Sequence, residues 1–132
     1  MDRLFLDANI LFSAAYRDDA GVAALWSLEA ATLITSTYAI EEARRNLRKR
    51  EQKLRLEQLA RGLHVVQFVS APDVLTTRVS LPGKDLPILA GAIASNSTHL
   101  ITGDVRHFGQ YFGKRIEGVL ILRPADYLRG RW

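Results

Sequence analysis

At 132 residues and a net charge of +4, with 48% hydrophobic and 24% charged residues, the chain has the size and composition of one globular domain, residues 1–132, that buries a core without covalent staples. It contains no cysteine and three histidines, which excludes disulfides and thiolate metal sites and leaves oxygen atoms or histidine as metal ligands. The chain reaches Asp7 too soon for a signal peptide, and no apolar run approaches the ~20 residues that cross a bilayer, so we expect a cytoplasmic protein without a membrane partner.

Short apolar runs alternate with helical patterns along the chain. Strands are predicted over 3–6, 32–35, 63–69 and 119–122, and a further strand within 84–108. Helices are predicted over 10–15, 20–31 and 36–60, the last with Ser36 or Thr37 as its N-cap. Helical turns are predicted in 73–83 and 124–128, and an aromatic, basic connection over 109–118. In the longest helix the apolar series fades across 48–53, which predicts a kink or a break there.

Positive charge is concentrated in the second half of that long helix. Residues 43–61 contain eight Lys or Arg and two Glu, whereas the rest of the chain holds ten positive and twelve negative residues. A basic segment of this kind binds a phosphate backbone, but a helix face that is simply solvated has the same composition. Both interpretations stay open, and the candidate nucleic-acid contacts are Arg44, Arg45, Arg48 and, elsewhere in the chain, Arg106.

The stretch from Lys84 to Phe108 is typical of a short apolar helix, a turn and a strand. Asp85 stands at its start and Asp104 just past the strand. A helix of ~10 residues rises ~15 Å, and a strand of ~5 residues covers ~16 Å. A strand that runs back along the helix therefore brings the two aspartates close together.

Carboxylates are expected to gather at one edge of the sheet. Strands that alternate with helices predict a parallel sheet covered on both faces, and such sheets bind ligands at the carboxyl ends of their strands. Asp7 follows the first strand and Asp104 the fourth, and the helix–strand return adds Asp85. Glu41 and Glu42 lie near the start of the helix that leaves the second strand, so three or four acids converge on this rim.

Each acid also has a purely structural interpretation. Asp85, Asp104 and either Asp7 or Asn9 precede predicted helices, as N-caps do, and Glu42 suits an early turn of a helix. A cluster is harder to explain in this way, because like charges raise each other's pKa and cost stability unless a cation neutralises them. Oxygen ligands without cysteine suit Mg²⁺ or Mn²⁺, and such an ion activates water for attack on a phosphodiester.

Four segments carry a family resemblance: LFLDANILFSA, STYAIEEARRNL, KDLPILAGAIAS and LITGDVRHF. In this order and spacing they resemble a PIN domain, and in particular the VapC-type toxin ribonucleases of VapBC toxin–antitoxin pairs. The resemblance implies an α/β fold, a three-layer α/β/α sandwich around a parallel sheet of four or five strands. It also implies that Asp7, Glu42, Asp85 and Asp104 are the catalytic acids, with Asp7, Asp85 and Asp104 as metal ligands, and it favours Glu42 over Glu41.

The implied activity is Mg²⁺- or Mn²⁺-dependent endoribonucleolytic cleavage, with RNA as substrate and a cognate antitoxin as protein partner. Asn9 and Thr102 match polar positions of the family that hold a ligand or a water molecule in place. His107 is expected to pack beneath the site rather than to act in it. The alternative is a non-catalytic PIN-like module that binds RNA or protein. The RNA target, the number of metal ions and the formation of a homodimer are left open.

Overall fold

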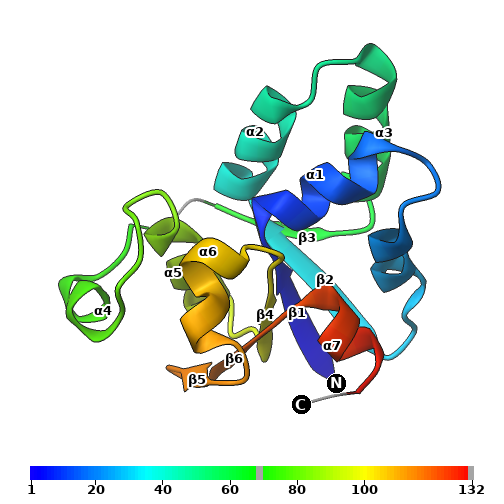
Figure 1. Cartoon of the computed structure of the whole chain (residues 1–132). Helices are drawn as coiled ribbons and strands as arrows, with labels where there is room; N and C mark the ends of the chain where they lie inside the picture. Colours follow the sequence, from blue (N-terminus) through cyan, green and yellow to red (C-terminus); the bar gives the residue numbers. More distant parts are fainter. Residues whose placement is uncertain (68–69, 131–132) are drawn as a thin grey trace.

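A six-stranded sheet forms the centre of the computed structural model, which describes residues 1–67 and 70–130 (Figure 1). The strands lie in the order β3-β2-β1-β4-β6-β5. Their bounds are β1 Asp2–Leu6, β2 Ala31–Ser36, β3 His64–Val66, β4 His99–Ile101, β5 Arg115–Ile116 and β6 Val119–Leu122. The first five strands in this order are parallel, which confirms the predicted parallel sheet. Of the strand predicted over 63–69, positions 68 and 69 fall outside the described residues.

The edge strand β5 was not predicted, because residues 109–118 have the composition of a connection. It pairs antiparallel with β6, Ile116 opposite Val119. The two residues between them, Glu117 and Gly118, have φ of 50° and 85°. Positive φ at both central positions is the geometry of a type I′ hairpin turn. Glutamate is an unusual residue at the first of these positions, so the sequence pattern does not predict the turn.

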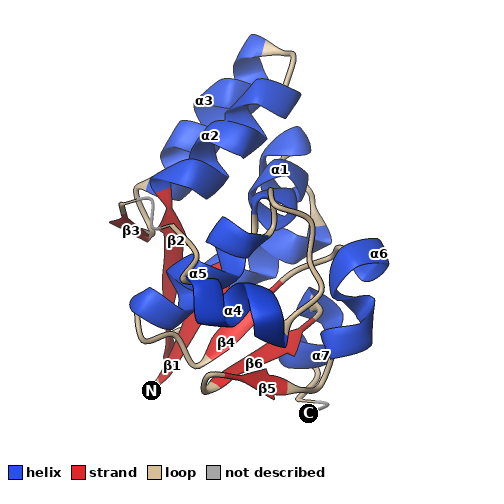
Figure 2. Ribbon diagram, turned by 90° about the vertical axis from the view of Figure 1, so that its left-hand side faces the viewer, coloured by secondary structure: helices blue, strands red, loops and turns tan. Residues whose placement is uncertain are grey.

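Helices cover both faces of the sheet. Their bounds are α1 Ala8–Tyr16, α2 Thr37–Asn46, α3 Arg50–Ala60, α4 Asp73–Arg78, α5 Leu86–Ala94, α6 Val105–Phe108 and α7 Pro124–Leu128, with the short 3-10 helices η1 Gly21–Ser27 and η2 Gly109–Tyr111. α1 packs against α2, α3 and η1, whereas α5 packs against β2 and β4. Together with the sheet they make the predicted three-layer α/β/α arrangement. The pair α2–α3 projects past the ends of the strands (Figure 2).

The long helix predicted over 36–60 is indeed broken. Its first part, α2, begins at the predicted cap, where the Ser36 hydroxyl accepts a hydrogen bond from the backbone N–H of Ala39 at 3.1 Å. Leu47 is extended and buried, and α3 starts afresh after Lys49, whose backbone N–H donates to the Gln52 side chain at 3.1 Å. The helix therefore ends before the basic residues 48–50, and the chain extends at Leu47 so that this side chain can be buried.

The α-helix predicted over 20–31 is wrong, since the chain forms only the 3-10 helix η1 there. Tertiary contacts explain the difference. Leu25 is fully buried, and the indole N–H of Trp26 donates to the carbonyl of Leu59 on α3 at 3.0 Å. The chain is already extended at Leu28, ahead of β2 at Ala31, which leaves no room for further α-helical turns.

The two central strands and α5 are packed closely. Leu4, Phe5 and Leu6 of β1 have no exposed surface, as expected for a strand buried on both faces. A Cβ atom at Gly91 of α5 would lie 2.9 Å from Cζ of Phe5, so glycine lets α5 approach the sheet at this point. This close packing fixes the start of α5, and with it Asp85, relative to the end of β1.

Strand order reverses between β1 and β4. The chain leaves β1 for β2 and β3 on one side and returns to β4 on the other. In open α/β sheets the crevice at the carboxyl ends of such neighbouring strands is where ligands bind. Within residues 1–67 and 70–130, no helix has the length and apolar character needed to span a membrane.

Candidate functional site

Asp7 lies at the carboxyl end of β1 and is held by three hydrogen bonds. Its Oδ1 accepts from the backbone N–H of Ala8 at 2.6 Å. Its Oδ2 accepts from the hydroxyl of Thr102 at 2.8 Å and from Nδ2 of Asn9 at 3.0 Å. The Oδ1 of Asn9 in turn accepts from the backbone N–H of Gly103 at 2.8 Å. Asn9 and Thr102 thus tie the exits of β1 and β4 together and fix the Asp7 carboxylate.

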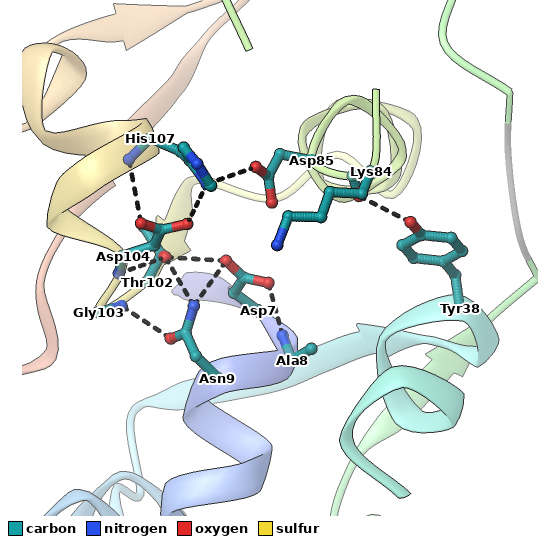
Figure 3. Close-up of polar contacts among 10 residues, drawn as sticks. All are labelled: Asp7, Ala8, Asn9, Tyr38, Lys84, Asp85, Thr102, Gly103, Asp104 and His107. Carbon is teal, nitrogen blue, oxygen red and sulfur yellow. Dashed lines mark hydrogen bonds and ion pairs between the residues drawn. The ribbon is translucent and has the colours of Figure 1, made fainter. Parts of the chain in front are cut away.

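Asp85, Asp104 and His107 form a tight group beside Asp7 (Figure 3). Nδ1 of His107 lies 2.8 Å from Oδ2 of Asp104 and 3.0 Å from Oδ2 of Asp85. One ligand atom from each of the three residues falls within 4.8 Å of the others. The helix–strand return therefore brings Asp85 and Asp104 together, as its lengths predicted.

The two aspartates differ in how they meet their helices. Asp104 caps α6, since its Oδ1 accepts from the backbone N–H of His107 at 3.0 Å. Asp85 occupies the N-cap position of α5, yet its side chain makes no capping hydrogen bond. Its Oδ2 is buried and takes part in no hydrogen bond within the described residues, although it lies 3.0 Å from Nδ1 of His107, which also faces Asp104. A buried carboxylate oxygen without a donor is costly, and a cation would satisfy it.

Burial and repulsion between carboxylates disfavour the charged forms of Asp7 and Asp85. Burial raises the pKa of Asp7 to about 7, against the opposing effect of its hydrogen bonds with Thr102 and Ala8, while Asp85 and Glu42 raise it further. Burial also raises the pKa of Asp85, where the charges of His107 and Lys84 oppose the shift. Carboxylates that resist ionisation when alone are stabilised by a bound cation.

A cavity of about 670 Å³ joins the acids. Asp7, Glu42, Asp85 and Asp104 all line it, so the four acids predicted from the sequence share one space at the strand ends. Glu41, the other glutamate considered, does not line it and pairs with Arg44 at 2.6 Å on the exposed side of α2. Asp7 lies in the cavity but outside the tight group of Asp85, Asp104 and His107.

The donor set fits a hard divalent cation. It consists of carboxylate oxygens with one imidazole nearby and no sulfur, the ligands that Mg²⁺ and Mn²⁺ accept. The Oδ2 of Asp85 is buried without a hydrogen bond among the described residues, and a cation at this point would lower the cost of burying it. Asp85, Asp104 and His107 have ligand atoms close enough together to hold such an ion, and Asp7 lines the same cavity.

The basic candidates lie outside the cavity. Arg45 and Arg48 are exposed at the end of α2 and just after it, and Arg106 is exposed on α6. Arg44 is partly buried and paired with Glu41. None of these four arginines lines the acidic cavity, so any contact that they make with a nucleic acid lies along the strand away from the acids.

Two residues that lie at the site were not predicted to be part of it. His107 was expected beneath the site, whereas the structure places its ring between Asp85 and Asp104. The sequence feature that could have predicted this position is the spacing of His107, three residues after Asp104. Because Asp104 caps the helix, this spacing turns the imidazole back toward the Asp104 carboxylate. Lys84 also lines the cavity, and its position next to Asp85 gives no indication of where its long side chain points.

Comparison with solved structures shows proteins of the same fold. The chain superimposes on VapBC2 from Rickettsia felis with a TM-score of 0.67 at 18% identity, over 92% of this chain and 98% of the other. A toxin–antitoxin complex from Klebsiella pneumoniae gives 0.65 at 22% identity, over 89% and 95%. VapBC-1 from nontypeable Haemophilus influenzae gives 0.60 at 20% identity, over 93% and 98%.

The fold is therefore the PIN-like α/β fold of the VapBC proteins. The resemblance to PIN domains seen in the sequence is confirmed at the level of structure. No family model matches the sequence, and no curated protein matches it.

Proposed function

We propose that this protein is a Mg²⁺- or Mn²⁺-dependent endoribonuclease that acts as the toxin of a toxin–antitoxin pair. The observation that carries the proposal is the group of Asp85, Asp104 and His107, in which a buried carboxylate oxygen of Asp85 takes part in no hydrogen bond. Asp7 and Glu42 complete an acidic cavity at the point where the strand order reverses. A non-catalytic binding module would gain nothing from burying uncompensated carboxylates.

The protein's own residues divide the work of phosphodiester hydrolysis. Asp7, Asp85 and Asp104 would hold the ion, which lowers the pKa of a water molecule and offsets charge on the phosphate oxygens. Asn9 and Thr102 keep the Asp7 carboxylate in one orientation through their hydrogen bonds to Oδ2.

Glu42 lines the same cavity and would accept the proton that the attacking water loses. As the water oxygen bonds to phosphorus, the ester bond to one sugar oxygen breaks. That sugar oxygen keeps the electron pair and takes up a proton, so the products are a phosphate end and a hydroxyl end.

The substrate and the partner follow from charge and from the structural neighbours. Arg45 and Arg48 with the rest of the basic segment would hold the RNA backbone along the strand, away from the acids, and Arg44 and Arg106 would extend the contact. The neighbours in the comparison include toxin–antitoxin complexes, which supports a protein partner that restrains the activity. RNA rather than DNA as the substrate rests on the resemblance to VapC-type toxins.

Cleavage assays test this proposal. Purified protein is incubated with a structured RNA and a DNA of the same sequence, in Mg²⁺, in Mn²⁺ and in EDTA. We expect RNA cleavage with either metal, none in EDTA, and recovery when Mn²⁺ is added in excess of the chelator. RNA binding without cleavage under all conditions would contradict the proposal and would establish the non-catalytic alternative.

A further inference from the structure

Lys84 is held in place by its backbone at the mouth of the acidic cavity. Its carbonyl accepts a hydrogen bond from the Tyr38 hydroxyl of α2 at 2.7 Å. The next residue, Asp85, donates its backbone N–H to the carbonyl of Pro82 at 2.9 Å, which closes a turn around Lys84. The Cα atom is therefore fixed from two sides, although the side chain itself is exposed.

The side chain is directed into the site. Figure 3 shows the ammonium group pointing toward the space between Asp7 and Asp85. Among the described residues, Lys84 has no ion pair within 4.0 Å, and its charge acts on Asp85 only through space, lowering that residue's pKa. The ammonium group is thus close to the acids without being bound by one of them.

Charge gives Lys84 a distinct place in the cavity. Of the described residues that line it, Lys84 is the one lysine or arginine, facing the carboxylates of Asp7, Glu42, Asp85 and Asp104. A bound divalent ion offsets only part of this negative charge, and a phosphodiester brings one more. An anionic substrate entering an anionic site needs a cation that is not already committed to a carboxylate.

We propose that Lys84 binds a non-bridging oxygen of the scissile phosphodiester and stabilises the charge that builds on it as water adds to phosphorus. A lysine ammonium acts on phosphate as a mobile point charge, and a donor aimed at developing charge in such a site is worth ~100-fold or more in rate. This inference rests on the proposed nuclease function, and it adds a substrate-binding cation to the metal-binding acids.

The experiment compares Lys84→Met and Lys84→Arg with a matched control, Lys114→Met, an exposed lysine that does not line the cavity. The melting temperature of each variant is recorded, and three functional measurements are made: Mn²⁺ affinity by calorimetry without RNA, affinity for an RNA oligonucleotide in Ca²⁺, and steady-state kinetics (kcat and KM) with Mn²⁺. Ca²⁺ takes oxygen ligands in a flexible geometry and serves to retain the RNA without turnover.

We expect Lys84→Met to keep or slightly raise Mn²⁺ affinity, because a nearby positive charge is removed. Lys84→Met is also expected to lower RNA affinity in Ca²⁺ by ~5-fold and kcat by ~100-fold. Lys84→Arg recovers at least ~10-fold of the lost rate. Lys114→Met changes none of the three functional measurements. A structural role would instead lower the melting temperature and Mn²⁺ affinity together, and that result overturns the inference. Equal RNA affinity and equal kcat in Lys84→Met and wild type also overturn it.

Failure of the nuclease function is distinguishable from failure of this inference. If wild-type protein cleaves no RNA, the proposed function fails on the wild-type result alone. The Ca²⁺ arm then still decides on Lys84: weaker RNA binding by Lys84→Met but not by Lys114→Met supports a phosphate-binding lysine, and identical binding by all three proteins refutes it.

Discussion

At the scale of single residues, Asp85 shows how a capping position can serve a site. It stands where an N-cap belongs, directly before Leu86-Pro87, but leaves the capping hydrogen bond unmade and turns its side chain to His107 and Asp104. The sequence around Asp85 predicts an N-cap as readily as a residue of the acidic group. Only its neighbours in space, His107 and Asp104, show that it belongs to this group. The cost of this arrangement is a buried carboxylate that the protein alone does not satisfy.

That cost gives a prediction about stability and pH. Burial raises the pKa of Asp85 in the folded state, so the folded protein binds this proton more tightly than the unfolded chain does. Ionised Asp85 therefore lowers the stability of the fold. This loss of stability is absent below the ordinary carboxyl pKa, grows as pH rises, and is complete above the folded-state pKa. In EDTA we expect Asp85→Asn to raise the melting temperature at pH 8 by ~3 °C or more, which corresponds to ~1 kcal/mol for a domain of this size, and to change it little near pH 4.

The control for this measurement is Asp18→Asn, at an exposed aspartate away from the cavity, which is expected to be neutral at both pH values. Mn²⁺ is expected to stabilise the wild type more than Asp85→Asn, because binding to the folded state alone raises stability. A lower melting temperature for Asp85→Asn at pH 8 in EDTA would show that the carboxylate stabilises the metal-free fold.

His107 and Lys84 mark the limit of prediction at this scale. The convergence of Asp7, Asp85 and Asp104 on one rim was predictable because strand ends can be located from apolar runs, whereas the choice of Glu42 over Glu41 rested on the family resemblance. Which way an imidazole or a lysine turns depends on side-chain rotamers and on packing from distant elements, such as the Tyr38 hydroxyl that fixes the Lys84 backbone. No periodicity in the sequence encodes that contact.

At the scale of elements, α5 lies close to β1 because Gly91 has no side chain. We expect Gly91→Ala to destabilise the protein by up to ~2 kcal/mol, since an overpacking cost of ~1–3 kcal/mol against the buried Phe5 ring is only partly offset by the gain in helix propensity of ~1 kcal/mol. Chemical denaturation measures this, with Gly83→Ala as control, where a Cβ would meet nothing within 4 Å. Equal or higher stability of Gly91→Ala would mean that Phe5 and α5 shift apart at no cost.

The basic segment makes a second prediction at this scale. We expect Arg45→Gln combined with Arg48→Gln to weaken RNA binding and to reduce the slope of log affinity against log salt by up to ~1.4, since each phosphate contact on a single strand contributes ~0.7. The control removes the same charge elsewhere, with Arg17→Gln and Arg78→Gln, both exposed. A slope that the first pair leaves unchanged would assign this segment to solvent or to a protein partner.

Elements were predictable where local chemistry sets them. The Ser36 cap and the break near Leu47 follow from residue type and from a fading apolar series, and both are present. The 3-10 form of residues 21–27 and the β5–β6 turn were not predictable. The first depends on a contact between Trp26 and α3, and the second depends on Glu117 adopting a positive φ.

At the scale of the whole molecule, the order of the strands makes the site. Leu6 of β1 and Ile101 of β4 are paired in the sheet, and Asp7 and Thr102 are the residues that directly follow them. Asp7 and Thr102 come into contact only because β1 lies beside β4. The sequence predicted a parallel sheet and acids at its carboxyl edge, which suffices for convergence on one rim. It did not predict which strands are neighbours, because that depends on long-range packing of helices on both faces.

The variant Asp104→Asn decides whether these acids form a metal-dependent phosphodiester-cleaving site. The substitution keeps the oxygen that caps α6, so the fold is expected to persist, as circular dichroism would verify. A ligand charge worth several kcal/mol in the transition state corresponds to at least ~1000-fold in rate. We predict that folded Asp104→Asn cleaves RNA at least ~1000-fold more slowly than wild type in saturating Mn²⁺, and an equal rate would contradict the account.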